Sequence, residues 1–331
     1  MRLAKPVLAA ALAASACLAQ AQQFTMKLST PTVGDVTVEW MNRFKAGVEK
    51  RSGGRIKVEI YPGSQLGQIP RTVEGVALGT MEMTVPAVGF FVGLEPRFQV
   101  FDAPGLFDSV EHAQKVFADP DIRKRLSSFG AAKGVEPLFT FANGPLMLLS
   151  HRPVRRVEDL QGLKIRVPGG TPLHTEPFRR LGASPLSMPL GEVMPAMQNK
   201  AIDGFTAALV VFVAFKYYDV TKHLTELPGS FLIASGLVNR SFMKSLGGLE
   251  PMVREEARKA EDAFVHGAIA DVNRLRGAWQ KNGGEIIQLP PAEAPRYLQQ
   301  ATSALPAILS ADRQLREDYD ALVAAAQRNR R

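Results

Sequence analysis

Arg166 is the residue whose type and position most clearly offer chemistry. It stands at the end of a predicted strand, 164–167, directly before the turn Pro168-Gly169-Gly170. Open α/β sheets bind ligands at the carboxyl ends of their strands, and a guanidinium there presents a planar fork that matches a carboxylate. The spacing alone leaves a second interpretation open, in which Arg166 braces the turn or pairs with Glu192.

The sequence carries no recognisable enzyme motif. Its five histidines are scattered without a His-Glu-x-x-His pattern, and its one cysteine, Cys17, has no partner, so no metal-ligand spacing is present. It also has no Gly-x-Ser-x-Gly elbow, no Walker-type loop and no Gly-x-Gly-x-x-Gly after a strand. We therefore expect no metal, no cofactor and no catalytic residue, with a secreted enzyme of unrecognised type as the remaining alternative.

The amino terminus has the pattern of a secretory signal. Arg2 and Lys5 precede an apolar stretch over 7–18, which is shorter than the ~20 residues of a membrane-spanning helix and is followed by Ala19-Gln20-Ala21. We expect cleavage after residue 21 and a periplasmic location. Lipidation at Cys17 is the alternative, although the residues before it match a lipoprotein signal less well.

Composition limits the possible partners. The formal charge is +8, from 40 Lys and Arg against 32 Asp and Glu, and loss of Arg2 and Lys5 with the leader would leave +6. This excess is spread along the chain, which argues against nucleic-acid binding. Without a cysteine after the leader the fold must depend on its hydrophobic core, and 46% hydrophobic residues can supply one.

The elements that would position Arg166 belong to an open α/β fold. Alternation predicts strands over 24–29, 55–61 and 81–87, and helical spacing predicts helices over 36–50 and 69–78 between them. Alternating strands and helices indicate a sheet with crossover helices.

Two features of the remaining chain bear on its organisation. Asn143-Gly144-Pro145 separates apolar strands over 138–142 and 146–150, which could form a hairpin or one long crossover between two lobes. A helical pattern from about 250 to 282 would be on the order of 50 Å long, enough to span both lobes. The apolar stretch 207–215 is too short to cross a bilayer and fits a core or pocket-lining helix.

Several motifs, in their order and intervals, resemble the solute receptors of tripartite ATP-independent periplasmic (TRAP) transporters, the DctP family. The resemblance covers almost the whole chain after the leader. Its carriers are Ser52-Gly53-Gly54-Arg55-Ile56, Tyr61-Pro62-Gly63-Ser64-Gln65-Leu66-Gly67, Arg152-Pro153-Val154, Glu158-Asp159-Leu160-Gln161-Gly162-Leu163-Lys164-Ile165-Arg166-Val167-Pro168, Gly191-Glu192-Val193-Met194 and Ile202-Asp203-Gly204.

This resemblance implies a two-lobed periplasmic binding protein fold with open sheets, a ligand cleft between the lobes and a long helix spanning both. Lobe 1 would comprise 22–143 and about 230–265, and lobe 2 would comprise 144–229 and about 266–331. The resemblance also implies a receptor that captures a small organic acid, holds its carboxylate on Arg166 and delivers it to membrane permease subunits. A subunit that reports ligand to a membrane sensor would use the same cleft and stays an alternative. We expect a monomer rather than a dimer.

The sequence departs from the family pattern at two positions. Many members carry a second arginine where this chain has Leu146. After the Asp-Gly pair, here Asp203 and Gly204, the family usually has polar residues, whereas this chain has Phe205. A second buried carboxylate would lack a partner there, so we expect a monocarboxylate with an apolar or aromatic body, such as a branched-chain or aromatic oxo or hydroxy acid. The full set of predicted ligand contacts is Arg166, Phe205, Asn143, Gln65, Leu146, Phe90, Phe91 and Phe212, with Glu192, Asp203 and Gly204 as supporting residues.

Overall fold

The computed structural model describes residues 23–330, with the side chains of 262–270 left out. The predicted signal over 1–21 and the lipidation alternative at Cys17 therefore lie outside the described residues. The helices run over Val36–Arg51 (α2), Ile69–Leu78 (α3), Val110–Ala118 (α4), Pro120–Leu126 (α5), Pro172–Arg180 (α6), Leu190–Gln198 (α7), Leu209–Ala214 (α8), Arg240–Ser245 (α9), Glu250–Lys281 (α10), Glu293–Thr302 (α11), Leu305–Ala311 (α12) and Arg313–Arg328 (α13). Two of the short 3-10 helices, Val88–Phe91 (η1) and Pro96–Asp102 (η2), lie near the site.

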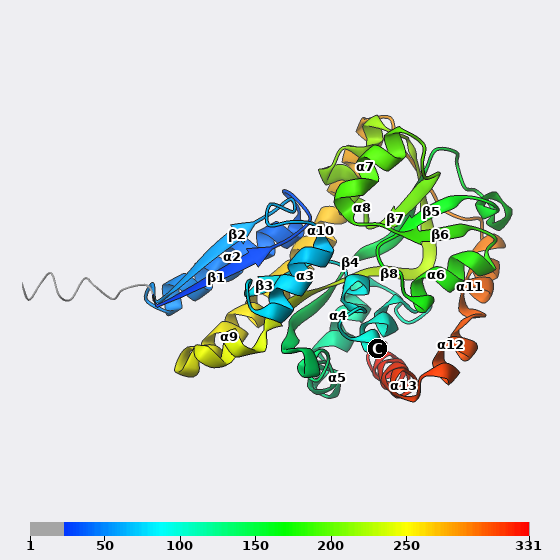
Figure 1. Ribbon diagram of the computed structural model, residues 1–331. Helices are drawn as coiled ribbons and strands as arrows, with labels where there is room; N and C mark the ends of the chain where they lie inside the picture. Colours follow the sequence, from blue (N-terminus) through cyan, green and yellow to red (C-terminus); the bar gives the residue numbers. More distant parts are fainter. Residues whose placement is uncertain (1–22, 331) are drawn as a thin grey trace, which may run out of the picture.

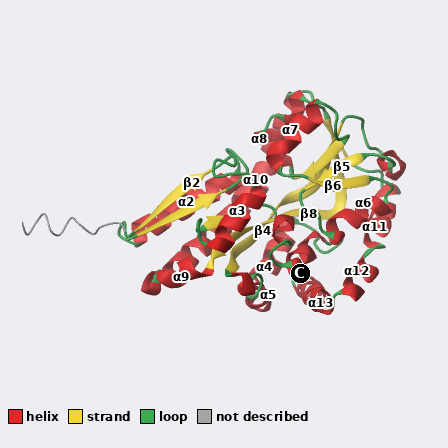
Figure 2. Cartoon of the chain, viewed as in Figure 1, coloured by secondary structure: helices red, strands yellow, loops and turns green. Residues whose placement is uncertain are grey.

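The described strands form one sheet with the order β2-β1-β3-β8-β4-β7-β5-β6, and β9 pairs with β8. They run over Phe24–Ser29 (β1), Ile56–Tyr61 (β2), Met83–Thr84 (β3), Val135–Ser150 (β4), Lys164–Val167 (β5), Ser184–Ser187 (β6), Gly204–Ala207 (β7), His223–Asn239 (β8) and Glu285–Ile287 (β9). The parallel pairs β1–β2 and β5–β6 lie toward opposite ends, and the antiparallel pair β4–β8 joins them. We call the part around β1–β3 and α2–α5 lobe 1 and the part around β5–β7 and α6–α8 lobe 2 (Figures 1 and 2).

The long strand β4 decides between the two interpretations of Asn143-Gly144-Pro145. The chain does not turn back there; it continues as one strand that pairs with β8 from Val135 to Ser150. The register shifts between Ala142 and Gly144 and again after Pro145. A proline cannot donate to the ladder, and an irregularity of this kind bends a strand. The segment is therefore a crossover between the lobes and no hairpin.

Helix α10 confirms the expected long helix. Its 32 residues at ~1.5 Å each extend about 48 Å. It packs against α2 and α4 of lobe 1 and against α8 of lobe 2, and Figure 1 shows it passing between the two parts. The helix and the strands β4 and β8 are thus shared by both lobes.

Lobe 1 has its core between α2 and the sheet. Asp35 caps α2 by accepting a hydrogen bond from the Val38 backbone N–H, as N-cap residues do. Trp40 and Phe44 recur at helical spacing and are fully buried, and the Trp40 ring stacks on Phe139 of β4 at 3.8 Å between centroids. The apolar stripe seen in the sequence therefore faces the crossover strand.

The carboxyl-terminal segment differs from the expected lobe division. The sequence assignment placed 266–331 in lobe 2, but α13 packs against η2, α4 and α5 of lobe 1. The Asp318 side chain is fully buried and forms ion pairs of 2.6 Å with Arg97 and 2.7 Å with Arg125. A buried carboxylate requires such partners, and only lobe 1 provides them here. Helix α11, in contrast, packs on α6 of lobe 2.

Candidate functional site

Arg166 is buried, and none of the side chains that the structure describes is an acidic partner for it. It lies in β5, between β6 and β7, and the whole residue is only 2% exposed. Its Nε donates to the Met188 carbonyl at 2.8 Å and its Nη1 to the Thr206 carbonyl at 3.3 Å. Within residues 23–330, leaving aside the side chains of 262–270, it forms no ion pair with a carboxylate. Burial lowers the pKa of Arg166 to about 10, so the group stays charged at neutral pH.

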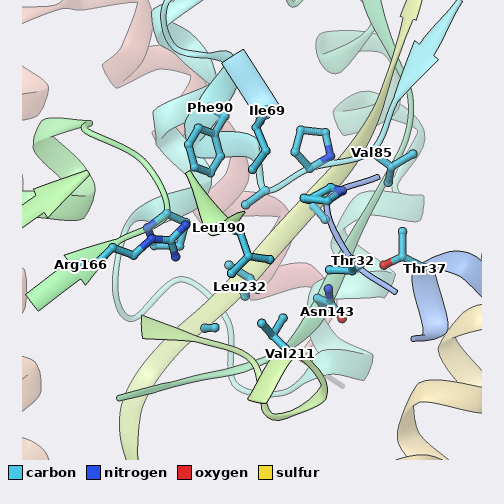
Figure 3. Close-up of a pocket in the computed structure, with 16 residues that line it drawn as sticks. Thr32, Thr37, Ile69, Val85, Phe90, Asn143, Arg166, Leu190, Val211 and Leu232 are labelled. Carbon is cyan, nitrogen blue, oxygen red and sulfur yellow. The ribbon is translucent and has the colours of Figure 1, made fainter. Parts of the chain in front are cut away.

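Arg166 lines a small pocket between the lobes (Figure 3). Thr32, Thr37 and Asn143 are the other polar residues of its wall, and the rest of the lining is aliphatic or aromatic or comes from prolines. The lining is drawn from lobe 1, from lobe 2 and from the crossover strands; Ile69, Phe90, Leu190, Val211 and Leu232 are examples. The free volume is about 40 Å³, whereas one water needs roughly 10–15 Å³.

The lobes touch each other around this pocket. A Cβ atom built on Gly169, in the turn after β5, would lie 2.6 Å from the Cα of Gly89 in η1. On another side of the contact, a Cβ on Gly191 would lie 2.6 Å from the Gln68 amide. Gly169 therefore allows an approach of two backbones that any larger residue would prevent, whereas at Gly191 the exposed Gln68 side chain can move aside. The lobes are closed in this structure.

A polar contact accompanies the glycine contact. Asp102, at the end of η2, accepts a hydrogen bond of 3.1 Å from the Thr171 hydroxyl at the start of α6. The His174 Nδ1 lies 3.4 Å from the other oxygen of the same carboxylate. These residues are almost completely buried and come from different lobes. The closed arrangement thus has its own polar contacts, separate from the pocket.

The structure brings together three of the predicted contact residues, Arg166, Asn143 and Phe90, on the pocket wall. Figure 3 shows the Asn143 amide and the Arg166 guanidinium among the apolar side chains. The Asn143 Oδ1 is buried and has no hydrogen-bond partner among the described residues.

The other predicted contact residues do not lie on this wall. Phe205 is beside Arg166 in the sheet but packs behind the pocket, against Tyr217 at 4.6 Å and Phe212 at 5.0 Å between ring centroids. Phe91 turns away from its neighbour Phe90 and packs on Phe98 in lobe 1. Leu146 is buried in β4, and Gln65 is exposed to solvent. These side chains lie in the core or at the surface and do not line the cavity.

The supporting residues act in different ways. Glu192 is exposed and forms no ion pair with Arg166 in the described chain, so the alternative in which they pair does not hold. The Asp203 carboxylate accepts from the Lys164 backbone N–H at 2.8 Å, which fixes the start of β5. Gly204 lets β7 approach β4, since a Cβ there would lie 2.5 Å from the Leu149 carbonyl oxygen.

Sequence reasoning missed most of the apolar wall and the two threonines. Thr32, Thr37, Ile69, Leu190 and Leu232 are ordinary residues in ordinary elements, and nothing in their spacing marks a cavity. The one signal was the apolar stretch over 207–215, which we expected in the core or beside a pocket; α8 lies there and supplies Val211 to the wall.

None of the helices placed in the structure is long and apolar enough to span a membrane. Likewise, among the described residues no three His, Cys, Asp or Glu side chains gather as they would around a metal ion.

Comparison with known proteins gives a consistent result. The family model described as bacterial extracellular solute-binding protein, family 7 (DctP) matches residues 29–310. The 2,3-diketo-L-gulonate-binding periplasmic protein YiaO of Escherichia coli is 30% identical over 283 residues, 84% of each chain. The C4-dicarboxylate-binding periplasmic protein DctP of Rhodobacter capsulatus is 30% identical over 260 residues, 72% of this chain and 78% of that protein.

A solved structure shows the same fold. The TRAP periplasmic solute-binding protein of Desulfovibrio salexigens, crystallised with orotic acid, superposes with a TM-score of 0.87 at 24% sequence identity, over 92% of this chain and 99% of that chain.

Proposed function

The chain belongs to family 7 of the bacterial extracellular solute-binding proteins, the DctP family, and we propose that its ligand is a small monocarboxylate with an apolar body. Members of this family are receptors of TRAP transporters and not enzymes, and the chain is a TRAP solute-binding receptor for small organic acids. The identity of the acid is the open point, and the geometry of the pocket bears on it.

The buried, unpaired guanidinium of Arg166 is the observation that carries the proposal. An isolated charge is costly to bury, and the two backbone carbonyls that it reaches supply only partial compensation. The remaining N–H groups of the fork can donate to a carboxylate in the bidentate manner that arginine favours. A bound acid would therefore supply the missing negative charge.

The rest of the wall favours a single carboxylate. Arg166 is the one cationic residue among the lining residues of the described chain, and Leu146 stands where the family resemblance leads us to expect a second arginine. The remaining surface is mainly aliphatic, with Phe90 as its aromatic member. Among relatives, the diketogulonate and orotate ligands have one carboxylate each, whereas R. capsulatus DctP is named for C4-dicarboxylates.

Capture would proceed by closure of the lobes. The acid would bind Arg166 in lobe 2, and closure would bring the lobe 1 wall and the Gly89–Gly169 contact into place. Because the complete wall exists only when the lobes are closed, the ligand stabilises that form. We further propose that the protein acts as a monomer in the periplasm after cleavage of residues 1–21 and that the closed form is delivered to the permease.

A calorimetric titration against matched acids tests the proposal. The protein from residue 22 onward would be titrated with aliphatic and aromatic monocarboxylates, their 2-oxo and 2-hydroxy derivatives, succinate, malate and sugar acids. We expect the tightest binding from a monocarboxylate with an apolar body. Tighter binding of succinate or malate than of any monocarboxylate would refute this ligand class, and it would leave the receptor assignment in place.

A further inference from the structure

A buried carboxylate lies on the lobe 1 side of the pocket. Asp35 is 6% exposed and precedes α2, where its Oδ1 accepts from the Val38 backbone N–H at 3.1 Å. Its Oδ2 has no hydrogen-bond partner among the described residues. Capping a helix needs one acceptor oxygen, which a neutral Asn or Ser provides equally well. The positive end of the α2 dipole also favours a negative charge here, but the cap uses only Oδ1 and leaves Oδ2 available on the pocket side of the helix start.

Asp35 lies directly behind the pocket wall. Thr32 and Thr37 line the pocket on either side of it in the sequence. Burial raises the pKa of Asp35 above its usual range, and contacts with the two threonine hydroxyls act in the opposite direction. Figure 3 shows the two threonines on one side of the pocket and Arg166 on the other.

No cation neutralises Asp35 in the described chain. The groove on its outer side also contains Glu39, Asp271 and Arg274. Glu39 is paired with Arg43, and Asp271 is paired with Arg274. The field of the Asp35 carboxylate is thus not cancelled by a contact ion pair, and Thr32 and Thr37 separate it from the cavity.

We propose that Asp35 sets the charge selectivity of the pocket by disfavouring acids with a second carboxylate; this inference rests on the proposed function of binding an organic acid at Arg166. A ligand whose first carboxylate is on Arg166 extends its other end toward Thr32 and Thr37. A neutral end meets no penalty there. A second carboxylate faces the buried Asp35 carboxyl, which either repels it as a like charge or must first bind a proton. Both are unfavourable at a pH above the pKa of Asp35 in a site of low dielectric constant.

The test is a titration of Asp35→Asn with two pairs of acids that differ only in one end group. Butyrate and succinate are one pair, and 2-hydroxybutyrate and malate are the other. We expect the substitution to tighten succinate and malate binding by about tenfold and to leave the monocarboxylate dissociation constants within about twofold. Asparagine keeps the cap on Val38, and Asp35→Ser, which also caps and has no charge, provides a second variant if the first folds poorly.

Asp312→Asn is the matched control. Asp312 caps α13 by accepting from Leu315 at 3.0 Å, away from the pocket lining, and its substitution should change neither class of acid. An unchanged ratio of mono- to dicarboxylate affinity in both Asp35 variants would overturn the inference. Failure of every monocarboxylate to bind the unmodified protein would refute the proposed ligand class, and the succinate and malate titrations would still report the effect of Asp35 independently.

Discussion

Replacing Arg166 by methionine should abolish binding of organic acids while the protein stays folded. Methionine has a similar length and fills the buried space without a charge. Burial lowers the pKa of Arg166 from its ordinary 12.5 to about 10. At about 1.4 kcal/mol for each tenfold change in proton affinity, burial of this charge costs about 3 kcal/mol.

The substitution removes this cost, but it also leaves the Met188 and Thr206 carbonyls without their donor. Each lost hydrogen bond to a buried acceptor costs about 1 kcal/mol or somewhat more. The two effects largely cancel, so the melting temperature of the unliganded variant should stay within a few degrees of the original. The ligand, in contrast, loses its charge-assisted pair, worth about 3 kcal/mol, and affinity should fall at least about 100-fold.

Isothermal titration calorimetry and thermal unfolding, with and without the best acid from the screen, measure both quantities. Arg166→Lys keeps the charge without the fork and should retain intermediate affinity. Arg180→Met, at an exposed position of α6, controls for loss of a positive charge. A folded Arg166→Met protein that binds the acid within threefold of the original would refute the assignment of Arg166 to the carboxylate.

Three further substitutions test other parts of the structure. Gly169→Ala places a Cβ about 2.6 Å from Gly89, so we expect about tenfold weaker ligand binding at unchanged unliganded stability; unchanged calorimetric affinity would show that closure does not need this approach. Asp318→Asn leaves the partly buried Arg97 and Arg125 without the buried carboxylate that they pair with, which should lower the free energy of unfolding in urea by about 3 kcal/mol; a loss under 1 kcal/mol would show that α13 is held by apolar packing alone. Burial raises the pKa of Asp35, so its folded form binds a proton more tightly than its unfolded form, and stability should decline as the pH rises from about 4 through the raised value and then level off. Asp35→Asn should lack this decline in pH-dependent melting curves, and an identical pH profile would contradict the raised pKa.

The local elements were largely predictable from the sequence. The strands β1 and β2, the helices α2 and α3 and the stop at Gly79 follow from alternation, from helical spacing and from a glycine in the left-handed conformation at φ 75°. The strand that we expected over 81–87 is the exception. Only Met83–Thr84 pairs as a strand, because the chain then enters the turns that carry Phe90 to the pocket.

The family, and with it the two-lobed fold, was also predictable, because its motifs occur in order along the whole chain. The sequence also pointed to Arg166, since it stands at the carboxyl end of a strand, where open α/β sheets bind ligands, and in a motif of the family. It could not decide the path of the chain at Asn143-Gly144-Pro145, because the same residues suit a hairpin or an irregular crossover. In the structure β4 pairs with β8 on both sides of the irregularity, so the segment is a crossover.

The pocket wall was decided by the tertiary structure alone. Phe205 and Phe90 are similar side chains beside glycines, but one faces the core aromatic cluster and the other the cavity. Which face an aromatic residue presents depends on the elements that pack against it, and those come from distant parts of the chain. The position of Asp35 behind the wall has the same origin. By itself the sequence determined most of the elements and the family and indicated one candidate anchor, Arg166, because these depend on local spacing and motif order. The surroundings of that arginine depend on how two lobes pack together, which only the folded chain determines.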